Sequence, residues 1–328
     1  MTGGREYIPG ERCEHTSFTS LPLTRSLNAR RSRFARAIAV TVACVATHAA
    51  SLVAQTPITG DSIHASKTLF TWRDPILAAG FVGLTFALLP VDQQIANRLQ
   101  DSTTQANRFF KNSSHVVEHI ADPGAVIIGI GMYGVGRLAH WKNVADLGLH
   151  GSEAVILGGA ITTLTKDIAG RARPYVSSDT SPHDFKLFRG FHKDDGYRSF
   201  PSGHATVAFA AAAAVTSESQ RWWPHKTWLV APVMYGGASL VALSRMYNNK
   251  HWGSDVVLGA AVGTFSGIKV VRYTHGHTDN RIDRALLGLK VIPLSNGQVG
   301  LGWSNERRDD AGSARTEQAR PTLSGGTR

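Results

Sequence analysis

The stretch FPSGHATVAFAAAAAV, residues 200–215, places a loop end, a helix start and an alanine-rich apolar run next to one another. A helix beginning near Ser202 or Gly203 would present free backbone N–H groups, which attract anions. His204, on the first turn, would face the same anion. A Ser-Gly cap followed by one histidine is also common in proteins without a catalytic role, so this stretch alone predicts the helix more firmly than the function.

Similar apolar segments recur on both sides of this stretch. They are rich in Ala and Gly, and their pattern fits helices better than strands. We therefore predict an all-α bundle of about six Ala/Gly-rich helices with the site at one end. The segments cover residues 75–91, 124–138, 154–168, 204–215, 228–243 and 256–271.

These segments run for about 12 to 17 residues, whereas a bilayer needs about 20. The mean hydropathy of −0.11 is low for six membrane spans. Packed core helices and membrane spans therefore both remain open.

Other segments predict less regular structure. Residues 92–121 are amphipathic and favour a surface helix, whereas residues 175–200 are polar and favour a long loop. Residues 290–303 alternate around Asn296-Gly297, which predicts a short C-terminal β-hairpin. We divide the chain into an N-terminal segment (1–60), a helical domain (61–280), the hairpin (281–303) and a disordered tail (304–328).

The chain is basic, with 35 Lys and Arg against 24 Asp and Glu and a formal net charge of +11. This charge favours anionic partners such as phosphate esters, lipid headgroups or nucleic acid. Phe34 is the only aromatic residue among the arginines at 25–36 and 307–320, which is too few for a single-strand binding surface, so we do not expect nucleic acid as a partner.

The apolar residues 37–54 follow an arginine cluster, which is typical of a secretory signal or an uncleaved anchor. The two cysteines, Cys13 and Cys44, lie before or inside this segment. We therefore expect no disulfide or thiolate metal site in a mature domain.

A second motif, KDIAGRARP at residues 166–174, ends the apolar segment 154–168. Lys166 and Arg173 are seven residues apart and share a face if the helix continues. Pro174 makes Arg173 a helix boundary, because the residue before proline disfavours the helical conformation. Taken alone, these cations also fit a helix C-terminus that they complement electrostatically. Arg171 and Arg189 extend the cationic rim or are structural.

A third motif, SRMYNNKHWGSD, covers residues 244–255. Arg245 offers a planar fork of donors suited to phosphate oxygens. On a helical turn, Asp255 would accept a ring N–H from His251 and leave the other nitrogen for a substrate. The alternative interpretation is that Asp255 only caps a helix start.

Together, in this order, the three motifs resemble the three-part signature of the type 2 phosphatidic acid phosphatase and vanadium haloperoxidase superfamily, over about residues 75–272. The resemblance implies that His251 attacks phosphorus to form a phosphohistidine while Asp255 orients its ring. His204 would protonate the leaving oxygen and then activate water. The resemblance also implies a set of groups that neutralise the phosphate oxygens: Lys166, Arg173, Ser202, Gly203 and Arg245.

No metal or other cofactor is expected, because cationic side chains replace magnesium. The leading hypothesis is a phosphatase for lipid phosphate monoesters or pyrophosphates in the cell envelope. Its site would face away from the cytoplasm, because Arg221 and Lys226 lie in a turn opposite the motifs. The alternatives are a soluble, broad-specificity periplasmic acid phosphatase acting on small phosphate esters, a vanadium-dependent haloperoxidase and a non-enzymatic membrane protein. The substrate and the oligomeric state remain open.

Overall fold

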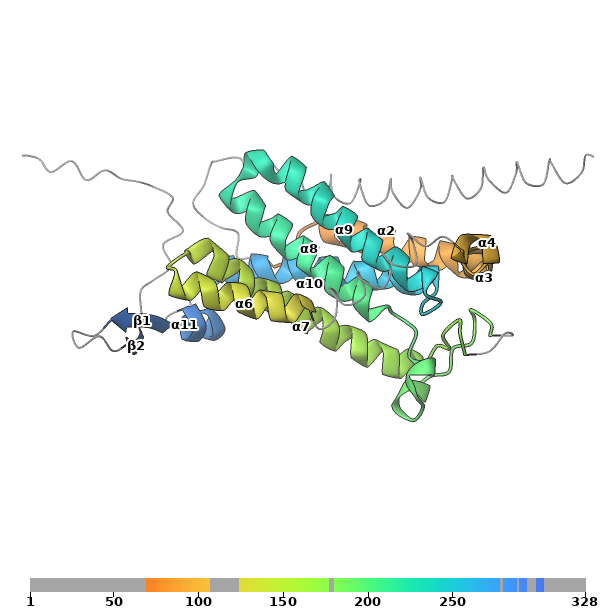
Figure 1. The fold of residues 1–328 in the computed structure, drawn as a ribbon. Helices are drawn as coiled ribbons and strands as arrows, with labels where there is room; N and C mark the ends of the chain where they lie inside the picture. The colour runs from red at the N-terminus through yellow and green to blue at the C-terminus, as the bar shows by residue number, and fades with distance from the viewer. Residues whose placement is uncertain are drawn as a thin grey trace, which may run out of the picture. The chain divides into compact units, whose positions relative to one another are not determined.

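The computed structural model describes residues 69–106, 124–176, 180–277, 280–287, 289–293 and 299–303 (Figure 1). The predicted signal at 37–54 and the predicted tail at 304–328 lie outside these residues. The described helices are α2 (Arg73–Leu88), α3 (Asp92–Leu99), α4 (Ser102–Gln105), α6 (Ala125–Leu138), α7 (Lys142–Ala169), α8 (Gly203–Trp222), α9 (Thr227–Tyr247), α10 (Gly253–Gly276) and α11 (Arg281–Leu287).

All six apolar segments form helices, as α2 and α6 to α10, but the predicted length of 12 to 17 residues was wrong for four of them. Helices α7, α8, α9 and α10 have 28, 20, 21 and 24 residues. Polar residues interrupt the apolar pattern without ending the helix, because a buried hydroxyl can donate to a carbonyl oxygen of its own helix. Ser152, for example, donates to the Gly148 carbonyl oxygen, one turn earlier in α7, at 2.7 Å.

Within the described residues, four helical segments are long and apolar enough to cross a membrane, by length and composition: Arg73–Leu99, Lys142–Ala169, Pro224–Tyr247 and Gly253–Gly276. Three of these segments, and the shorter apolar helix α6, carry large apolar side chains on their outer faces, which soluble proteins rarely gather in broad patches. Exposed examples on α2, α6, α7 and α9 are Ile76, Val82, Phe86, Ile127, Ile128, Ile130, Ile156, Leu164, Val233 and Leu240.

Helices α8 and α10 touch through their backbones along a stripe of glycines on α10. A Cβ added at Gly259, Gly263 or Gly267 would lie 2.2–2.6 Å from a carbonyl oxygen of α8. Only glycine permits so close an approach, as in tightly packed membrane helices. Helix α7 packs against both (Figure 1), and the hydroxyls of Thr162 and Thr206 lie 2.8 Å apart between α7 and α8.

Gly170 ends α7 in the left-handed conformation, with φ of +52°. The helix therefore stops before Arg173, so the condition under which Lys166 and Arg173 would share one helical face is not met. A Cβ at Gly170 would lie 2.2 Å from the Lys186 carbonyl oxygen, so the turn also needs glycine for space.

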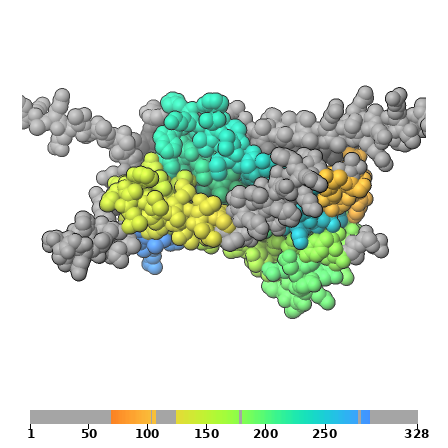
Figure 2. Space-filling view, in the orientation of Figure 1, coloured from red at the N-terminus to blue at the C-terminus, as the bar shows by residue number. Residues whose placement is uncertain are grey.

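The chain after Gly170 forms the predicted long loop, with short 3₁₀ turns at Arg189–Phe191 and Asp195–Tyr197. In the space-filling view this loop (green) lies at the far end of α7 from α6 (yellow) (Figure 2). The predicted surface helix at 92–121 is present as α3 and α4, and residues 107–123 lie outside the described part. Strands β1 (Leu289–Pro293) and β2 (Val299–Trp303) pair antiparallel. Residues 294–298 lie outside the described part, so the Asn-Gly hairpin stays a prediction.

Candidate active site

The three motifs meet where α7 ends and where α8 and α10 begin. The Ser202 N–H donates to the Asp255 carbonyl oxygen at 2.9 Å, which joins the start of α8 to the start of α10. A Cβ added at Gly203 would lie 3.8 Å from Lys166 Cε, so the end of α7 approaches the same point. The bundle therefore gathers motif residues that are far apart in sequence at one end of three helices.

His251 and Asp255 face each other, although not on one helical turn as predicted. His251 precedes α10, which begins at Gly253, and its Nδ1 lies 3.5 Å from Asp255 Oδ2. Asp255 also accepts the Trp252 N–H at 2.9 Å. The carboxylate therefore caps the helix and also faces the imidazole, whereas a hydrogen bond from His251 Nδ1 to Asp255 stays a prediction. Both side chains are buried.

Asp255 is held by donors on both oxygens. Arg171 Nη1 donates to Oδ1, and the Ser199 hydroxyl donates to Oδ2 at 2.5 Å. Sequence reasoning gave no role to Ser199, and it left Arg171 as either part of the cationic rim or structural; the structure favours the structural role. Arg171 is in fact fully buried, with an exposed fraction of 0%.

Arg171 connects Asp255 to a second buried carboxylate, Asp92 at the start of α3. Its Nη2 donates to Asp92 Oδ2 at 2.9 Å, and its Nη1 donates to the Ser254 hydroxyl at 2.7 Å. The Ser254 N–H donates to Asp92 Oδ1 at 3.0 Å. Sequence reasoning missed Asp92 and Ser254, because no local pattern indicates partners so far apart in the chain.

Arg173 and Lys166 approach the same site from the end of α7 and the loop after it. Arg173 Nη2 pairs with Asp195 Oδ1 at 2.8 Å, and its Nη1 donates to the Lys250 carbonyl oxygen at 3.4 Å. Lys250 directly precedes His251, so Arg173 lies close to the imidazole. Lys166 Nζ donates to the Arg198 carbonyl oxygen at 3.0 Å. Both cations are thereby fixed by the loop.

Arg245 and His204 complete the predicted set. Arg245 is buried in the last turn of α9, and the Lys250 N–H donates to its carbonyl oxygen at 3.0 Å. His204 is the second residue of α8, follows the Ser202 cap and is partly buried. The structure thus brings every predicted site residue to the same end of the bundle.

The imidazole of His251 lies in surroundings that oppose protonation. Burial lowers the pKa of His251 well below its ordinary value; the Asp255 carboxylate opposes this shift, and the charges of Lys166 and Arg173 add to it. A neutral imidazole keeps a lone pair, which a nucleophile requires.

A polar cavity of about 270 Å³ lies beside the site. Gln93 and Asn97 of α3 and Gln100, which follows α3, line one part of it, and Pro174 and Trp252 line the part next to the motifs. Amide side chains both donate and accept hydrogen bonds, so this part of the cavity is polar.

Comparisons with known proteins agree with these motifs. The chain is 42% identical over 69 residues to a lipid A 1-phosphatase of Porphyromonas gingivalis, covering 21% of this chain and 15% of that protein. It is 29% identical over 161 residues to a probable diacylglycerol pyrophosphate phosphatase 1 of Schizosaccharomyces pombe, covering 43% and 56%. A lipid A 1-phosphatase of Rhizobium etli is 30% identical over 120 residues, covering 37% and 47%.

The chain thus spans about half or less of the length of these relatives. Among solved structures, a transmembrane PAP2 type phosphatidylglycerolphosphate phosphatase from Bacillus subtilis aligns with a TM-score of 0.46 and 20% identity, over 64% of this chain and all of that one. Residues 149–279 match the model of the PAP2 superfamily. The matched part of the chain contains all three motifs and is similar to the PAP2 superfamily.

Proposed function

We propose that this chain is a membrane phosphatase that hydrolyses a lipid phosphate monoester or pyrophosphate through a phosphohistidine on His251, without a metal ion in the reaction. The observation that carries the proposal is the buried imidazole 3.5 Å from Asp255, a carboxylate that Arg171 and Ser199 fix in place. Cations from α7, α9 and the loop after α7 surround this pair.

In the first step, Nε2 of His251 attacks phosphorus, and the bond from phosphorus to the leaving oxygen breaks. Asp255 accepts the Nδ1–H, which keeps the ring in the tautomer whose Nε2 is nucleophilic and stabilises the positive charge that develops. His204 gives its proton to the leaving oxygen.

In the second step, His204 takes a proton from water, whose oxygen then attacks phosphorus. The bond between phosphorus and Nε2 breaks, which releases inorganic phosphate and restores neutral His251. In both steps, preorganised donors stabilise the negative oxygens of the transition state more than they stabilise the bound ester. We assign this task to Lys166, Arg173, Arg245, the Ser202 hydroxyl and the Gly203 N–H.

A lipid substrate is supported by two observations. Within the described residues, four helical segments are long and apolar enough to cross a membrane, and three of them expose large apolar side chains on their outer faces. The relatives are named for lipid phosphates, namely lipid A and diacylglycerol pyrophosphate. These observations favour the lipid phosphatase over a soluble acid phosphatase and over a haloperoxidase.

We place the enzyme in the cell envelope with its site facing away from the cytoplasm. Helix α8 begins at the site and ends at Trp222, so Arg221 and Lys226 flank the α8–α9 connection at the opposite end. Basic residues beside membrane spans favour the cytoplasmic side.

The test is phosphate release by purified protein in EDTA, with detergent-dispersed diacylglycerol pyrophosphate and p-nitrophenyl phosphate as parallel substrates. We expect the lipid to be preferred, His251→Ala to abolish release and His204→Ala to slow both steps. His225→Ala is the matched control, because His225 is exposed at the end of the bundle away from the motifs.

Wild-type turnover in folded His251→Ala would refute the mechanism. Preference for the soluble ester would refute the lipid assignment. Rapid acid-free quenching with a ³²P-labelled substrate adds a direct readout, since the label should remain on wild-type protein and be absent from His251→Ala.

A further inference from the structure

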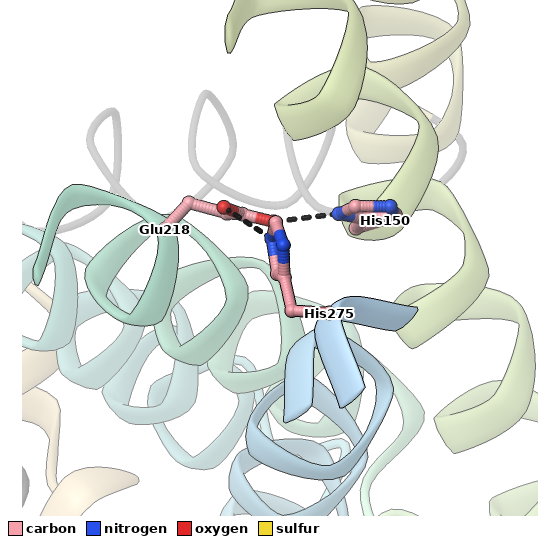
Figure 3. A group of neighbouring side chains, drawn as sticks. All are labelled: His150, Glu218 and His275. Atoms are coloured by element: carbon pink, nitrogen blue, oxygen red, sulfur yellow. Dashed lines mark hydrogen bonds and ion pairs between the residues drawn. The ribbon is translucent and has the colours of Figure 1, made fainter. Parts of the chain in front are cut away.

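At the other end of α7, α8 and α10 lies a buried cluster that the phosphatase chemistry does not use. His150 of α7, Glu218 of α8 and His275 of α10 point toward one another (Figure 3). Their exposed fractions are 0%, 0% and 6%. One ligand atom from each lies within 4.8 Å of the other two. Ionisable groups this deeply buried require compensation by an opposite charge or by a metal.

Both imidazoles are aimed at one carboxylate. His150 Nδ1 lies 2.6 Å from Glu218 Oε1, and His275 Nε2 lies 2.9 and 3.0 Å from the two Glu218 oxygens. The two rings meet edge to face, with centroids 5.3 Å apart. Two imidazoles and one carboxylate, each with a lone pair available, therefore face a common point.

A second carboxylate stands behind one of the rings. Asp283 Oδ2, from α11, lies 3.5 Å from His150 Nε2, on the opposite side of the ring from Glu218. A neutral imidazole has one N–H. If His150 donates this N–H from Nε2 to Asp283, its Nδ1 lone pair faces a Glu218 oxygen. The lone pairs of His150 Nδ1 and Glu218 Oε1, 2.6 Å apart, repel each other unless a positive charge lies between them. Carboxylates behind metal-bound histidines orient the ring in this way.

We infer that His150 Nδ1, His275 Nε2 and a Glu218 oxygen bind a divalent transition metal ion, with Asp283 orienting His150. Two imidazoles and one carboxylate suit Zn²⁺ and similar first-row ions, whereas Ca²⁺ and Mg²⁺ prefer all-oxygen sites. Ligand atoms about 2.0–2.1 Å from a tetrahedral ion are about 3.3 Å apart, so binding requires small side-chain rotations that open the shortest distance. Water fills the fourth position.

This site is separate from the phosphate chemistry. On α7, His150 lies sixteen residues before Lys166, which is about 24 Å at 1.5 Å per residue. The ion would join α7, α8 and α10 and hold α11 through Asp283, so its effect is on the stability of this end of the bundle. Chelation should therefore lower thermal stability while leaving the catalytic groups in place.

The competing arrangement contains protons instead of an ion. Two protonated histidines beside Glu218 and Asp283 would also balance the four charges. The two arrangements differ in metal content, which can be measured directly, and in whether added metal stabilises the protein.

The experiment uses the full chain, purified in detergent with a tag that contains no histidine. Protein stripped with a chelator is given a small excess of Zn²⁺, passed through a desalting column and analysed by plasma mass spectrometry. We expect about one ion per wild-type chain and at least a tenfold loss in Glu218→Gln, since even a change in a group that only orients a ligand weakens such sites by about 10–100-fold. His225→Ala, an exposed histidine, should keep the ion.

A second readout is the melting temperature, which should rise with Zn²⁺ in the wild type and in His225→Ala but not in Glu218→Gln, because only an ion bound to the folded state stabilises it. Co²⁺ in place of Zn²⁺ should give the visible absorption of a tetrahedral site. Wild-type protein that retains neither ion and melts at an unchanged temperature would overturn the inference, even if the variants fail to fold. Full retention in Glu218→Gln would overturn it as well.

Discussion

Replacing Arg171 with methionine should destabilise the protein more than any other single arginine change in the described part of the chain. The guanidinium is fully buried and bonds to two carboxylates, Asp92 and Asp255, whose exposed fractions are also 0%. Methionine fills a similar volume, so the main effect is electrostatic. Both carboxylates would remain in the interior without their shared cation.

The expected size follows from this burial. Removing one member of a buried ion network costs about 3–5 kcal/mol, because the remaining charges stay desolvated and uncompensated. A domain of this size loses about 2–4 °C of melting temperature per kcal/mol, so we expect a fall of roughly 6–20 °C. Adding Asp92→Asn should recover part of the loss, since it removes one of the two stranded charges.

Thermal unfolding in detergent, followed by circular dichroism, measures this effect. Arg272→Met is the matched control, because Arg272 is partly exposed and its partner Asp74 keeps Lys269. Because Asp74 would still pair with Lys269, the loss of this partly exposed arginine should cost only about 0–1 kcal/mol. If Arg171→Met melts within the range of this control, then the buried network does not stabilise the fold as argued.

Three further predictions test other features. Gly263→Ala should destabilise the protein by about 1–3 kcal/mol through overpacking against α8. Gly159→Ala should stabilise it by about 0.5–1 kcal/mol, because a Cβ added there has no neighbour within 4 Å. Chemical denaturation compares the two variants, and equal effects would contradict the close contact between α8 and α10. Burial lowers the pKa of His251 below its ordinary 6.5, so the unfolded chain binds a proton that the folded chain does not. The free energy of unfolding should therefore fall as the pH drops below about 6.5. In His251→Gln the free energy of unfolding should depend less steeply on pH, and an unchanged slope would argue against the shift. Ser199→Ala removes a donor to Asp255 and should lower kcat by roughly ten- to a hundredfold or slightly more, with little change in KM. This fall corresponds to a loss of about 1.5–3 kcal/mol in transition-state stabilisation. An unaltered kcat in steady-state assays would show that this donor is dispensable.

Much of the helical fold could be predicted from the sequence because apolar periodicity is local. Each of the six segments shows its helix within its own residues. Helix lengths were underestimated where a buried polar side chain bonds to a carbonyl oxygen of its own helix, as Ser152 does. The end of α7 was predicted at Arg173 because Pro174 is a strong signal, although Gly170 provides the actual stop.

The motif residues of the site were also visible in the sequence, because their types and spacing are concentrated in three short stretches. The residues that position these motif residues through hydrogen bonds and ion pairs were not visible in the sequence. Arg171 bonds to partners 79 and 84 positions away, and Glu218 meets His150 and His275 across 68 and 57 positions. One sequence without aligned relatives contains no pattern that pairs such distant residues.

The glycine stripe on α10 limits which positions of this protein can accept substitutions during evolution. Because backbone meets backbone between α8 and α10, no side chain there can adopt another rotamer and alter the gap between the helices. His204 lies in the first turn of one of these helices and His251 precedes the other, so the spacing of the proposed acid and the proposed nucleophile is set inside the bundle. The outer apolar faces are therefore free to diversify with the thickness and composition of different membranes, while the catalytic spacing stays the same.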